Sequence, residues 1–558
     1  MYFTVAISAA TRDRCAALVG AALDTDPRVM PIPGPARVAW RAPDERTAVL
    51  HWGAEGSSGA SHAGTIWIGP APAVLRARTG LARVDPVYLA ETPGAVVVSD
   101  RACWAAAVTG RLDDHDPVMA GAFLHLGFPA GAATPFRGVR ALAGDHSLRV
   151  TGGRAVIARA GDRHAGAGHR ARASDLGVAD ALVAAVRPLA EGAVPVELSL
   201  TGGKDSRLIA AALAAAGVPF RARTHGFARH PDVVIARMIA ERLGLEHMVT
   251  EPRAAASGPG PQSPDRAEIL ARLRSAVLVS DGMLSAFENL GSRVRPDHEA
   301  AIEPVQAGGH GGELLRGGYA QTAWRSPAPR RPVSAAAAQA GSSAAAAELF
   351  RRLTTRRLRL LRPAAAAAYL ASLAPWAAAV GAGPVRALDD FYLVNRAGRW
   401  SAAARQAYLI RSPLVQPFFS DRVIRAARAV PLRQRMSDRL HRDVLASLAP
   451  ELLGLPLADH PWQGERPTAD TVLAAQPGAA APPDWRRSQA TTGFLREYVL
   501  DLGGVGGVGG AAQLFAIVSR PAAERALQPS QADPQAAWSL ATLAALLSGD
   551  WRNGQPRP

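Results

Sequence analysis

Short apolar runs alternate with amphipathic stretches in the middle of this chain. Residues 196–200 read as a buried strand, and apolar residues at helical spacing follow over 208–216. A second strand over 220–227 precedes another helical pattern over 231–244, which ends at Gly244. Because strand, helix, strand and helix follow one another, the pattern predicts an α/β fold with a doubly wound parallel sheet.

The first part of the chain has a different pattern. Short strands or turns bounded by glycine and proline are predicted over 96–101, 134–139 and 146–150. A polar, glycine-rich stretch then separates two parts of the chain. The predicted organisation is a β-rich domain over 1–160, a linker over 161–177, and a sheet domain with a helical C-terminal extension over 178–558.

Composition places the chain among ordinary globular proteins. Hydrophobic residues make up 48% and charged residues 20% of its 558 residues. The sequence shows neither an apolar run of membrane-spanning length nor a signal-type N-terminus, so we expect a cytoplasmic protein without a membrane partner. Two cysteines, Cys15 and Cys103, lack metal-ligand spacing and are expected to be buried thiols.

The net charge of +16 would suit a nucleic-acid partner, but the arginines are scattered, which argues against one. A basic surface also suits an acidic peptide or a triphosphate. Lys204 is the only lysine, and a compact ammonium beside a phosphate gives a physical reason for its presence.

The segment TGGKDS, residues 201–206, stands between the first predicted strand and helix. A turn at Gly202 and Gly203 would let an anion approach the backbone N–H groups at the positive end of a helix. Asp205 is placed to hold a magnesium ion against that anion, and Ser206 can cap the helix. The segment is not a Walker A loop, but it predicts a phosphate site.

Two glycine segments together carry a family resemblance. TGGKDS resembles the S-G-G-x-D-S loop of the ATP-pyrophosphatase superfamily, with Thr201 at the first serine position. GGHGGELLRGGY, residues 308–319, resembles the S-G-E-G-x-D-E-x-x-G-G-Y motif of the asparagine synthetase and β-lactam synthetase family. Aligned on the final Gly-Gly-Tyr, Glu313 takes the place of a metal-binding aspartate, and His310 that of a residue that contacts substrate or acts as base.

The resemblance implies ATP and Mg²⁺ as cofactors, with the metal held by Asp205 and Glu313. His310 and Lys204 are the implied catalytic residues. His225, at the end of a predicted strand, is either an adenine contact or a loop histidine without a role. The residues implied to bind the nucleotide are Leu200, Thr201, Gly202, Gly203, Lys204, Asp205, Ser206, His225 and Gly309.

The order of segments in residues 1–160 resembles the glutaminase-like, Ntn-hydrolase-like domain of that family. A working glutaminase of this kind uses a cysteine at the mature N-terminus, whose own amine acts as base. Here residue 2 is Tyr2 and the first cysteine is Cys15, so we expect an inactive domain, either a structural remnant or a peptide-docking surface.

The C-terminal part resembles the family's helical region over 389–400, 412–421 and 450–453. The family carries a lysine in an R-x-K-Q-G-F stretch that neutralises the transition state. Gln463 and Gly464 can be matched to it, but Trp462 stands at the lysine's place, and His460 or Arg466 are candidate replacements.

The resemblance implies adenylation of a carboxylate followed by coupling to an amine of the same substrate. The motifs are most similar to lasso peptide macrolactam synthetases, which implies a precursor peptide as substrate and leader-binding and leader-peptidase proteins as partners. A β-lactam- or asparagine-type enzyme acting on a small amino acid is the alternative. An RNA-modifying enzyme with the same loop and a non-enzymatic scaffold also stay open.

Overall fold

The computed structural model describes a large part of the chain. The described residues are 4–8, 41–44, 47–52, 64–68, 75–92, 95–151, 154–159, 177–192, 194–251, 264–290, 304–325, 335–409, 414–458, 460–463, 465, 468, 471–473, 484–501, 510–530 and 533–553. The predicted linker lies outside them except for Gly177, as do Tyr2, Cys15, Gly464 and Arg466. The predicted domain boundaries stay predictions.

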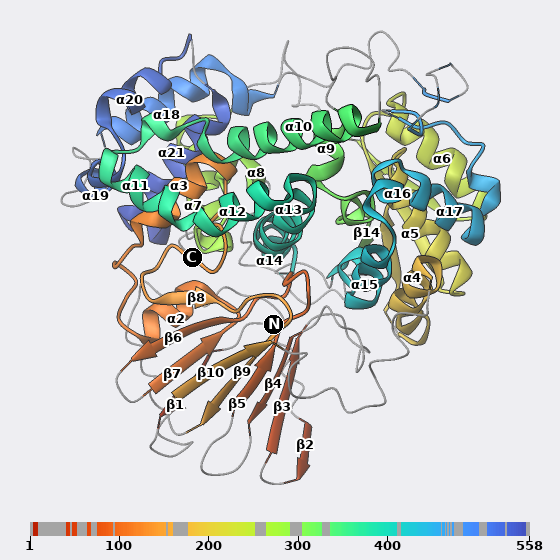
Figure 1. Ribbon diagram of the computed structural model, residues 1–558, viewed down its shortest axis with the longest axis horizontal. Helices are drawn as coiled ribbons and strands as arrows, with labels where there is room; N and C mark the ends of the chain where they lie inside the picture. The colour runs from red at the N-terminus through yellow and green to blue at the C-terminus, as the bar shows by residue number, and fades with distance from the viewer. Residues whose placement is uncertain are drawn as a thin grey trace.

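Five parallel strands form the sheet that the sequence predicts (Figure 1). Their order is β13 (His247–Thr250), β12 (Phe220–His225), β11 (Val196–Ser199), β14 (Val305–Gly308) and β15 (Leu414–Val415). From β11 the chain continues to β12 on one side, whereas β14 pairs with the other side of β11. The strand order therefore reverses between β11 and β14, and the segments that follow these two strands share one edge of the sheet.

Helices pack against this sheet. They include α4 (Val178–Val186), α5 (Lys204–Ala215), α6 (Pro231–Leu243), α15 (Asp421–Ala429) and α17 (Arg439–Leu448). Leu198 of β11, Leu208 and Ile209 of α5 and Ala222 of β12 lie in one buried core. Helix α5 is buried from Arg207 to Leu213, and residues 208–213 are all apolar, so this part of the helix has no polar face. Helix α6 ends at Gly244, as predicted, in the left-handed conformation that glycine favours.

The described strands before residue 160 form two antiparallel sheets. One has the order β1 (Thr4–Ser8), β7 (Ala95–Ser99), β6 (Tyr88–Thr92) and β8 (Val139–Ala141). The other has the order β10 (Arg154–Arg159), β9 (His146–Thr151), β5 (Leu75–Arg78), β4 (Gly64–Ile68), β3 (Thr47–Trp52) and β2 (Arg41–Asp44). Strands lie at 95–99 and 146–151, and the segment 134–139 contains an isolated bridge at Phe136, a turn at 137–138 and the start of β8, in line with the strands or turns predicted there.

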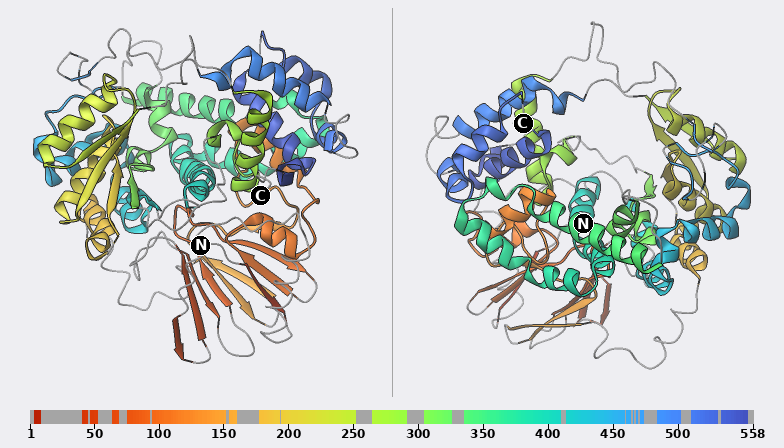
Figure 2. Two further views of the ribbon diagram at one scale, coloured as in Figure 1. Left: turned by 180° about the vertical axis from the view of Figure 1, so that it is seen from behind. Right: turned by 45° about the horizontal axis from the view of Figure 1, so that its top comes forward.

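Helices make up most of the remainder (Figure 2). They include α2 (Ala102–Val108), α3 (Pro117–Leu126), α7 (Arg266–Ser280), α8 (Ala286–Asn289), η2 (Gly312–Arg316), α9 (Tyr319–Arg325), α10 (Ala335–Thr355), η3 (Leu358–Leu360), α11 (Pro363–Ser372), α12 (Ala374–Ala382), α13 (Pro384–Phe391), the π-helix η4 (Tyr392–Ser401), α14 (Ala402–Leu409), η5 (Pro417–Phe419), α16 (Leu432–Met436), η6 (Pro450–Leu452), η7 (Trp485–Arg487), α18 (Gln489–Asp501), α19 (Gly510–Ile517), α20 (Arg520–Ala526), α21 (Pro534–Leu547) and η8 (Asp550–Asn553). Within the part of the chain that the structure describes, no single helix is long and apolar enough to cross a membrane; the bent pair α11 and α12 meets the length and composition test together.

The N-terminal domain and the helical region share one core. Tyr88 of β6 and Phe123 of α3 belong to the same buried cluster as Leu273 of α7 and Trp538 of α21. Burial of large aromatic side chains contributes strongly to stability, so the two regions are expected to unfold together.

Two buried ion pairs cross the same boundary. Arg101, which follows β7, donates from Nε to both carboxylate oxygens of Asp281 at 2.9 and 3.0 Å, and both side chains are 0% exposed. Arg405 of α14 donates from Nε to Oδ1 of Asp85 at 3.1 Å, also out of contact with solvent. A buried charge that loses its partner is costly, so these pairs fix the docking of the N-terminal domain.

Candidate active site

The two glycine segments touch each other at the carboxyl ends of β11 and β14. A Cβ atom on Gly309 would lie 2.5 Å from the backbone nitrogen of Ser206, and a Cβ atom on Gly312 would lie 2.2 Å from Cγ of Asp205. Real side-chain carbons do not approach other atoms so closely, and both distances require glycine. The contact brings Asp205 against Gly312, the residue before Glu313. The metal-binding roles implied for Asp205 and Glu313 stay predictions.

Most of the loop before α5 is organised by its own side chains. Ser206 Oγ accepts from the Thr201 N–H at 3.1 Å and lies 3.0 Å from Thr201 Oγ1. The expectation that Ser206 caps the helix is wrong, because Gly203 is the N-cap residue and Ser206 is already inside α5. The Gly202 N–H donates to Asp232 Oδ1 at 2.9 Å, a partner that the sequence did not indicate.

Gly203 is the loop residue with the most open surroundings. A Cβ atom there would meet only Thr201 Oγ1, at 3.3 Å, whereas one on Gly202 would press on Ala458 and Ile235. The backbone N–H groups of the first turn of a helix have no partner within the helix, and they attract anions. The anion is therefore expected to approach at Gly203 and the start of α5.

Lys204 points into the protein. Its side chain is 7% exposed, and Nζ donates to Asp438 Oδ2 at 2.7 Å and to the carbonyl of Pro461 at 3.1 Å. The same Nζ lies 5.0 Å from the centre of the Trp462 ring. Asp438 is fully buried and also accepts from Gln321 Nε2 at 2.7 Å. The loop is thereby tied to the C-terminal segment in which the resemblance expects a lysine.

Asp205 is held by two donors that sequence reasoning missed. Arg316 Nη2 donates to Oδ2 at 2.6 Å, and His441 Nε2 lies 2.9 Å from Oδ1. Burial alone would raise the pKa of Asp205, but the charge of Arg316 and the hydrogen bond from His441 lower it below its usual value. Burial lowers the pKa of His441 in spite of Asp205, so a neutral imidazole donates to an ionised carboxylate near neutral pH.

A second group of side chains surrounds Glu313, which is exposed on η2. His310 stacks on Trp400 with ring centres 5.3 Å apart and planes 7° from parallel. Arg396 lies over the same Trp400 ring, with its Cζ 3.4 Å from the ring centre. Desolvation lowers the pKa of His310, with Glu313 opposing and Arg396 adding to the effect. Arg396 and Trp400 are four residues apart, a spacing that places side chains on one face of a helix.

These residues fit a nucleotide and a magnesium ion. The glycine contacts leave the amides at the start of α5 beside the Asp205 carboxylate, and Glu313 supplies a second, exposed carboxylate. Magnesium prefers oxygen ligands and usually takes the rest from phosphates and water. Among the described residues, no group of three or more His, Cys, Asp or Glu side chains is arranged to hold a metal ion.

The sequence singled out three further residues, His225, Trp462 and His460. His225 ends β12 and is exposed, as a loop-edge residue should be, and its adenine contact stays a prediction. Trp462 is 4% exposed and packs beside the Lys204 ammonium, while His460 is exposed.

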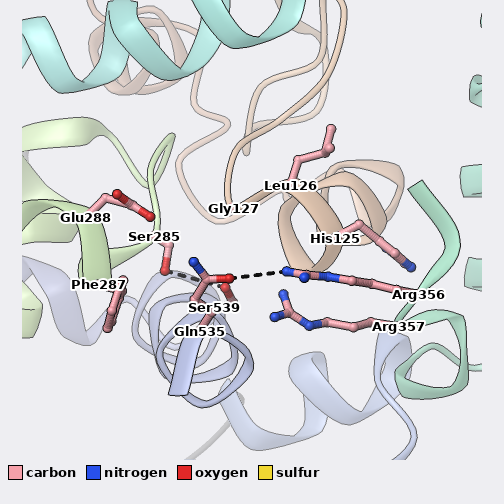
Figure 3. A pocket seen from close by; sticks show the side chains of 10 residues that line it. All are labelled: His125, Leu126, Gly127, Ser285, Phe287, Glu288, Arg356, Arg357, Gln535 and Ser539. Atoms are coloured by element: carbon pink, nitrogen blue, oxygen red, sulfur yellow. Dashed lines mark hydrogen bonds between the residues drawn. The ribbon is translucent and has the colours of Figure 1, made fainter. Parts of the chain in front are cut away.

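A small polar pocket lies elsewhere (Figure 3). Its cavity of about 30 Å³ has room for a water molecule and is far too small for a nucleotide. Arg356 reaches across it to Gln535 Oε1 at 3.2 Å, and Ser539 Oγ lies 3.4 Å from Ser285 Oγ. Its lining includes no residue of the two glycine segments, so it is separate from the candidate active site.

Comparison with known proteins gives one finding. A family model described as asparagine synthase matches residues 177–547, which include both glycine segments and most of the helical region. No curated protein matches the chain.

Proposed function

Because the chain belongs to the asparagine synthase family, whose members are ATP-dependent C–N ligases, we propose that it activates a carboxylate with ATP and couples it to an amine. The observation that carries the proposal is the contact between the two glycine segments, in which Gly309 and Gly312 lie against Asp205 and Ser206 in the first turn of α5. ATP is consumed as a co-substrate, and pyrophosphate and AMP are the expected products.

The proposed chemistry has two steps. A carboxylate oxygen of the substrate attacks the α-phosphorus of ATP, and pyrophosphate leaves toward the amides at the start of α5. Arg316 and Lys204 supply positive charge there, although Asp438 offsets much of the charge of Lys204. A magnesium ion held by Asp205 and Glu313 would neutralise phosphate charge. An amine then attacks the acyl carbon, AMP leaves, and an imidazole nitrogen of His310 takes the amine proton.

We further propose that acid and amine belong to one peptide, so that the product is a macrolactam of the lasso type. The proposal is supported by the segments TGGKDS and GGHGGELLRGGY, which are most similar to those of lasso peptide macrolactam synthetases. Leader-binding and leader-peptidase proteins are the proposed partners. Holding a folded peptide with its two ends together would remove much of the entropic barrier to ring closure.

The experiment is to incubate the protein with Mg-ATP and candidate precursor peptides that carry Asp or Glu in the core. Pyrophosphate and AMP release together with loss of one water from the peptide mass supports macrolactam synthesis. AMP formation only with small amino acids moves the assignment to β-lactam- or asparagine-type chemistry. Failure to cleave ATP with any carboxylate contradicts the ligase assignment for this chain.

Replacing Gly309 with alanine is expected to weaken ATP binding by at least about tenfold. The added Cβ atom would meet the backbone of Ser206 and Asp205 at 2.5 and 2.8 Å, so the start of α5 has to shift. Gly308→Ala is the matched control, because nothing lies within 4 Å of a Cβ atom at that position. Equilibrium binding of ATP measures both variants, and equal affinities would contradict the proposed site.

Amide formation is expected to be lost in acid through protonation of His310. Its pKa is lowered, so the neutral imidazole persists below the ordinary histidine value of about 6.5, and activity should fall only at more acid pH. In His310→Gln most of the rate of amide formation should be lost, and the rate that remains should no longer fall with His310 protonation. The pH profile of single-turnover amide formation tests the assignment, and an unchanged acid limb in the variant refutes it.

A further inference from the structure

The side chains that face His310 stand on an unusual helix. Residues Tyr392–Ser401 form a π-helix between α13 and α14, and this helix carries both Arg396 and Trp400. π-Helical turns are rare, appear mostly as single turns, and are frequently found at functional sites. A π-helix of ten residues is unusually long, so we expect contacts with neighbouring elements to stabilise it.

That support comes from the N-terminal domain. Arg83, between β5 and β6, is 3% exposed and has a positive φ of 52°. Its Nε donates to the Gly398 carbonyl at 3.2 Å and its Nη2 to the Val394 carbonyl at 3.4 Å, both within the π-helix. Burial lowers the pKa of Arg83 to about 9, so the guanidinium remains charged near neutral pH.

The other donors of Arg83 hold it within its own domain. Nη1 donates to the Leu142 carbonyl at 3.3 Å, and Nη2 donates to the Gly131 carbonyl at 3.0 Å. One side chain thus joins two carbonyls of the N-terminal domain to two carbonyls of the π-helix. Hydrogen bonds from a charged donor are stronger than neutral ones, and they matter most when buried.

The fit around Arg83 is close. A Cβ atom on Gly398 would lie 3.1 Å from the Ala82 carbonyl oxygen and 3.4 Å from Arg83 Nε. Glycine at 398 therefore allows the loop of the N-terminal domain to lie against the π-helix. Ala82 and Val84 on either side of Arg83 pack in one cluster that also contains Leu314 of η2 and, from the π-helix, Tyr392, Leu393 and Ala397.

We propose that residues 81–84 of the N-terminal domain are a structural part of the synthetase site, and that Arg83 is the positioning residue that fixes the π-helix. Through the π-helix it holds Trp400 against His310 and Arg396 over Trp400, and through Leu314 the same loop supports the element that carries Glu313. This gives the N-terminal domain a role that needs no glutaminase activity. The inference uses the site proposed above, but its first test does not depend on the reaction.

The first test is fluorine NMR of the full chain labelled with 5-fluorotryptophan. The Trp400 signal among the 11 tryptophans is assigned by its loss in Trp400→Phe. In Arg83→Met, which keeps an apolar stem but no donor, the Trp400 signal should shift or broaden while that of Trp538 stays in place. Arg83→Lys keeps a charged donor, so its Trp400 signal should lie closer to that of the parent protein. Arg140→Met, at a half-exposed arginine of the same domain, should change neither signal.

The second test measures the reaction. Arg83→Met should lower the rate of amide formation by about tenfold or more while ATP affinity stays unchanged, as expected for a residue that acts through its neighbours. If Arg83→Met does not fold, Gly398→Ala tests the same contact from the other side and should move the Trp400 signal. An unmoved Trp400 signal in a folded Arg83 or Gly398 variant overturns the inference, whether or not the chain proves to be a ligase.

Discussion

Asp205→Asn is expected to lower pyrophosphate release by about a thousandfold with the fold retained. The carboxylate accepts from Arg316 at 2.6 Å and lies 2.9 Å from His441 Nε2, and it is the less exposed member of the proposed metal pair. A neutral amide of the same shape cannot balance the charge of Arg316, and it is a weaker ligand for a hard cation. Pyrophosphate release from Mg-ATP with the acyl substrate measures the loss.

The matched control is Asp443→Asn on α17, whose carboxylate is 66% exposed and pairs loosely with Arg439 at 3.6 Å. Its activity should equal that of the parent protein. Circular dichroism and thermal unfolding of Asp205→Asn separate a chemical loss from a folding defect. A folded Asp205→Asn protein that keeps more than about a tenth of the activity would contradict the role given to this carboxylate.

Asp281→Asn is expected to lower the free energy of unfolding by about 3–5 kcal/mol. Both members of the Arg101–Asp281 pair are 0% exposed, and the variant leaves the guanidinium buried without a counter-charge. Arg101 Nη2 also donates to the Leu278 carbonyl at 2.8 Å, which keeps the cation in place instead of letting it reach water. Urea denaturation followed by tryptophan fluorescence measures the change.

Glu348→Gln serves as the comparison for Asp281→Asn. Glu348 pairs with Arg351 on the surface of α10, and water solvates both charges when they separate. Its unfolding midpoint should match that of the parent protein. Should Asp281→Asn also unfold at the parent midpoint, the pair would not fix the N-terminal domain.

The sequence predicted the parallel sheet because its signals are local. The helix over 231–244 ends where a left-handed glycine stops it, and the strand after Phe220 follows from its apolar spacing. The two glycine segments could be recognised for a related reason, since close backbone contact leaves only glycine at Gly309 and Gly312. Each of these signals depends on a few residues that are neighbours in the sequence.

The partners of the site could not be read in the same way. Asp438 lies 234 residues from Lys204, and His441 lies 236 residues from Asp205, so each pairing depends on how α17 packs against α5. The prediction that Ser206 caps the helix was wrong for a local reason. Gly203 takes the N-cap position, and the Ser206 hydroxyl instead accepts a hydrogen bond from the Thr201 N–H. Arg396 and Trp400 carried one usable signal, their four-residue spacing on a helix.

The burial of the Lys204 amine bears on whether the protein would acylate itself. An activated acyl group is an acylating agent, and free primary amines on a protein surface are its natural unwanted targets. Arginine supplies 62 of the 63 lysine and arginine residues in this sequence, and guanidinium groups are poor nucleophiles near neutral pH. Its single ε-amine is bound as an ammonium to Asp438 and covered by Trp462, so it has no lone pair to offer. In the proposed reaction the catalyst would thereby be protected from modification by its own acyl-adenylate intermediate, and the acyl group would be left for the amine of the substrate.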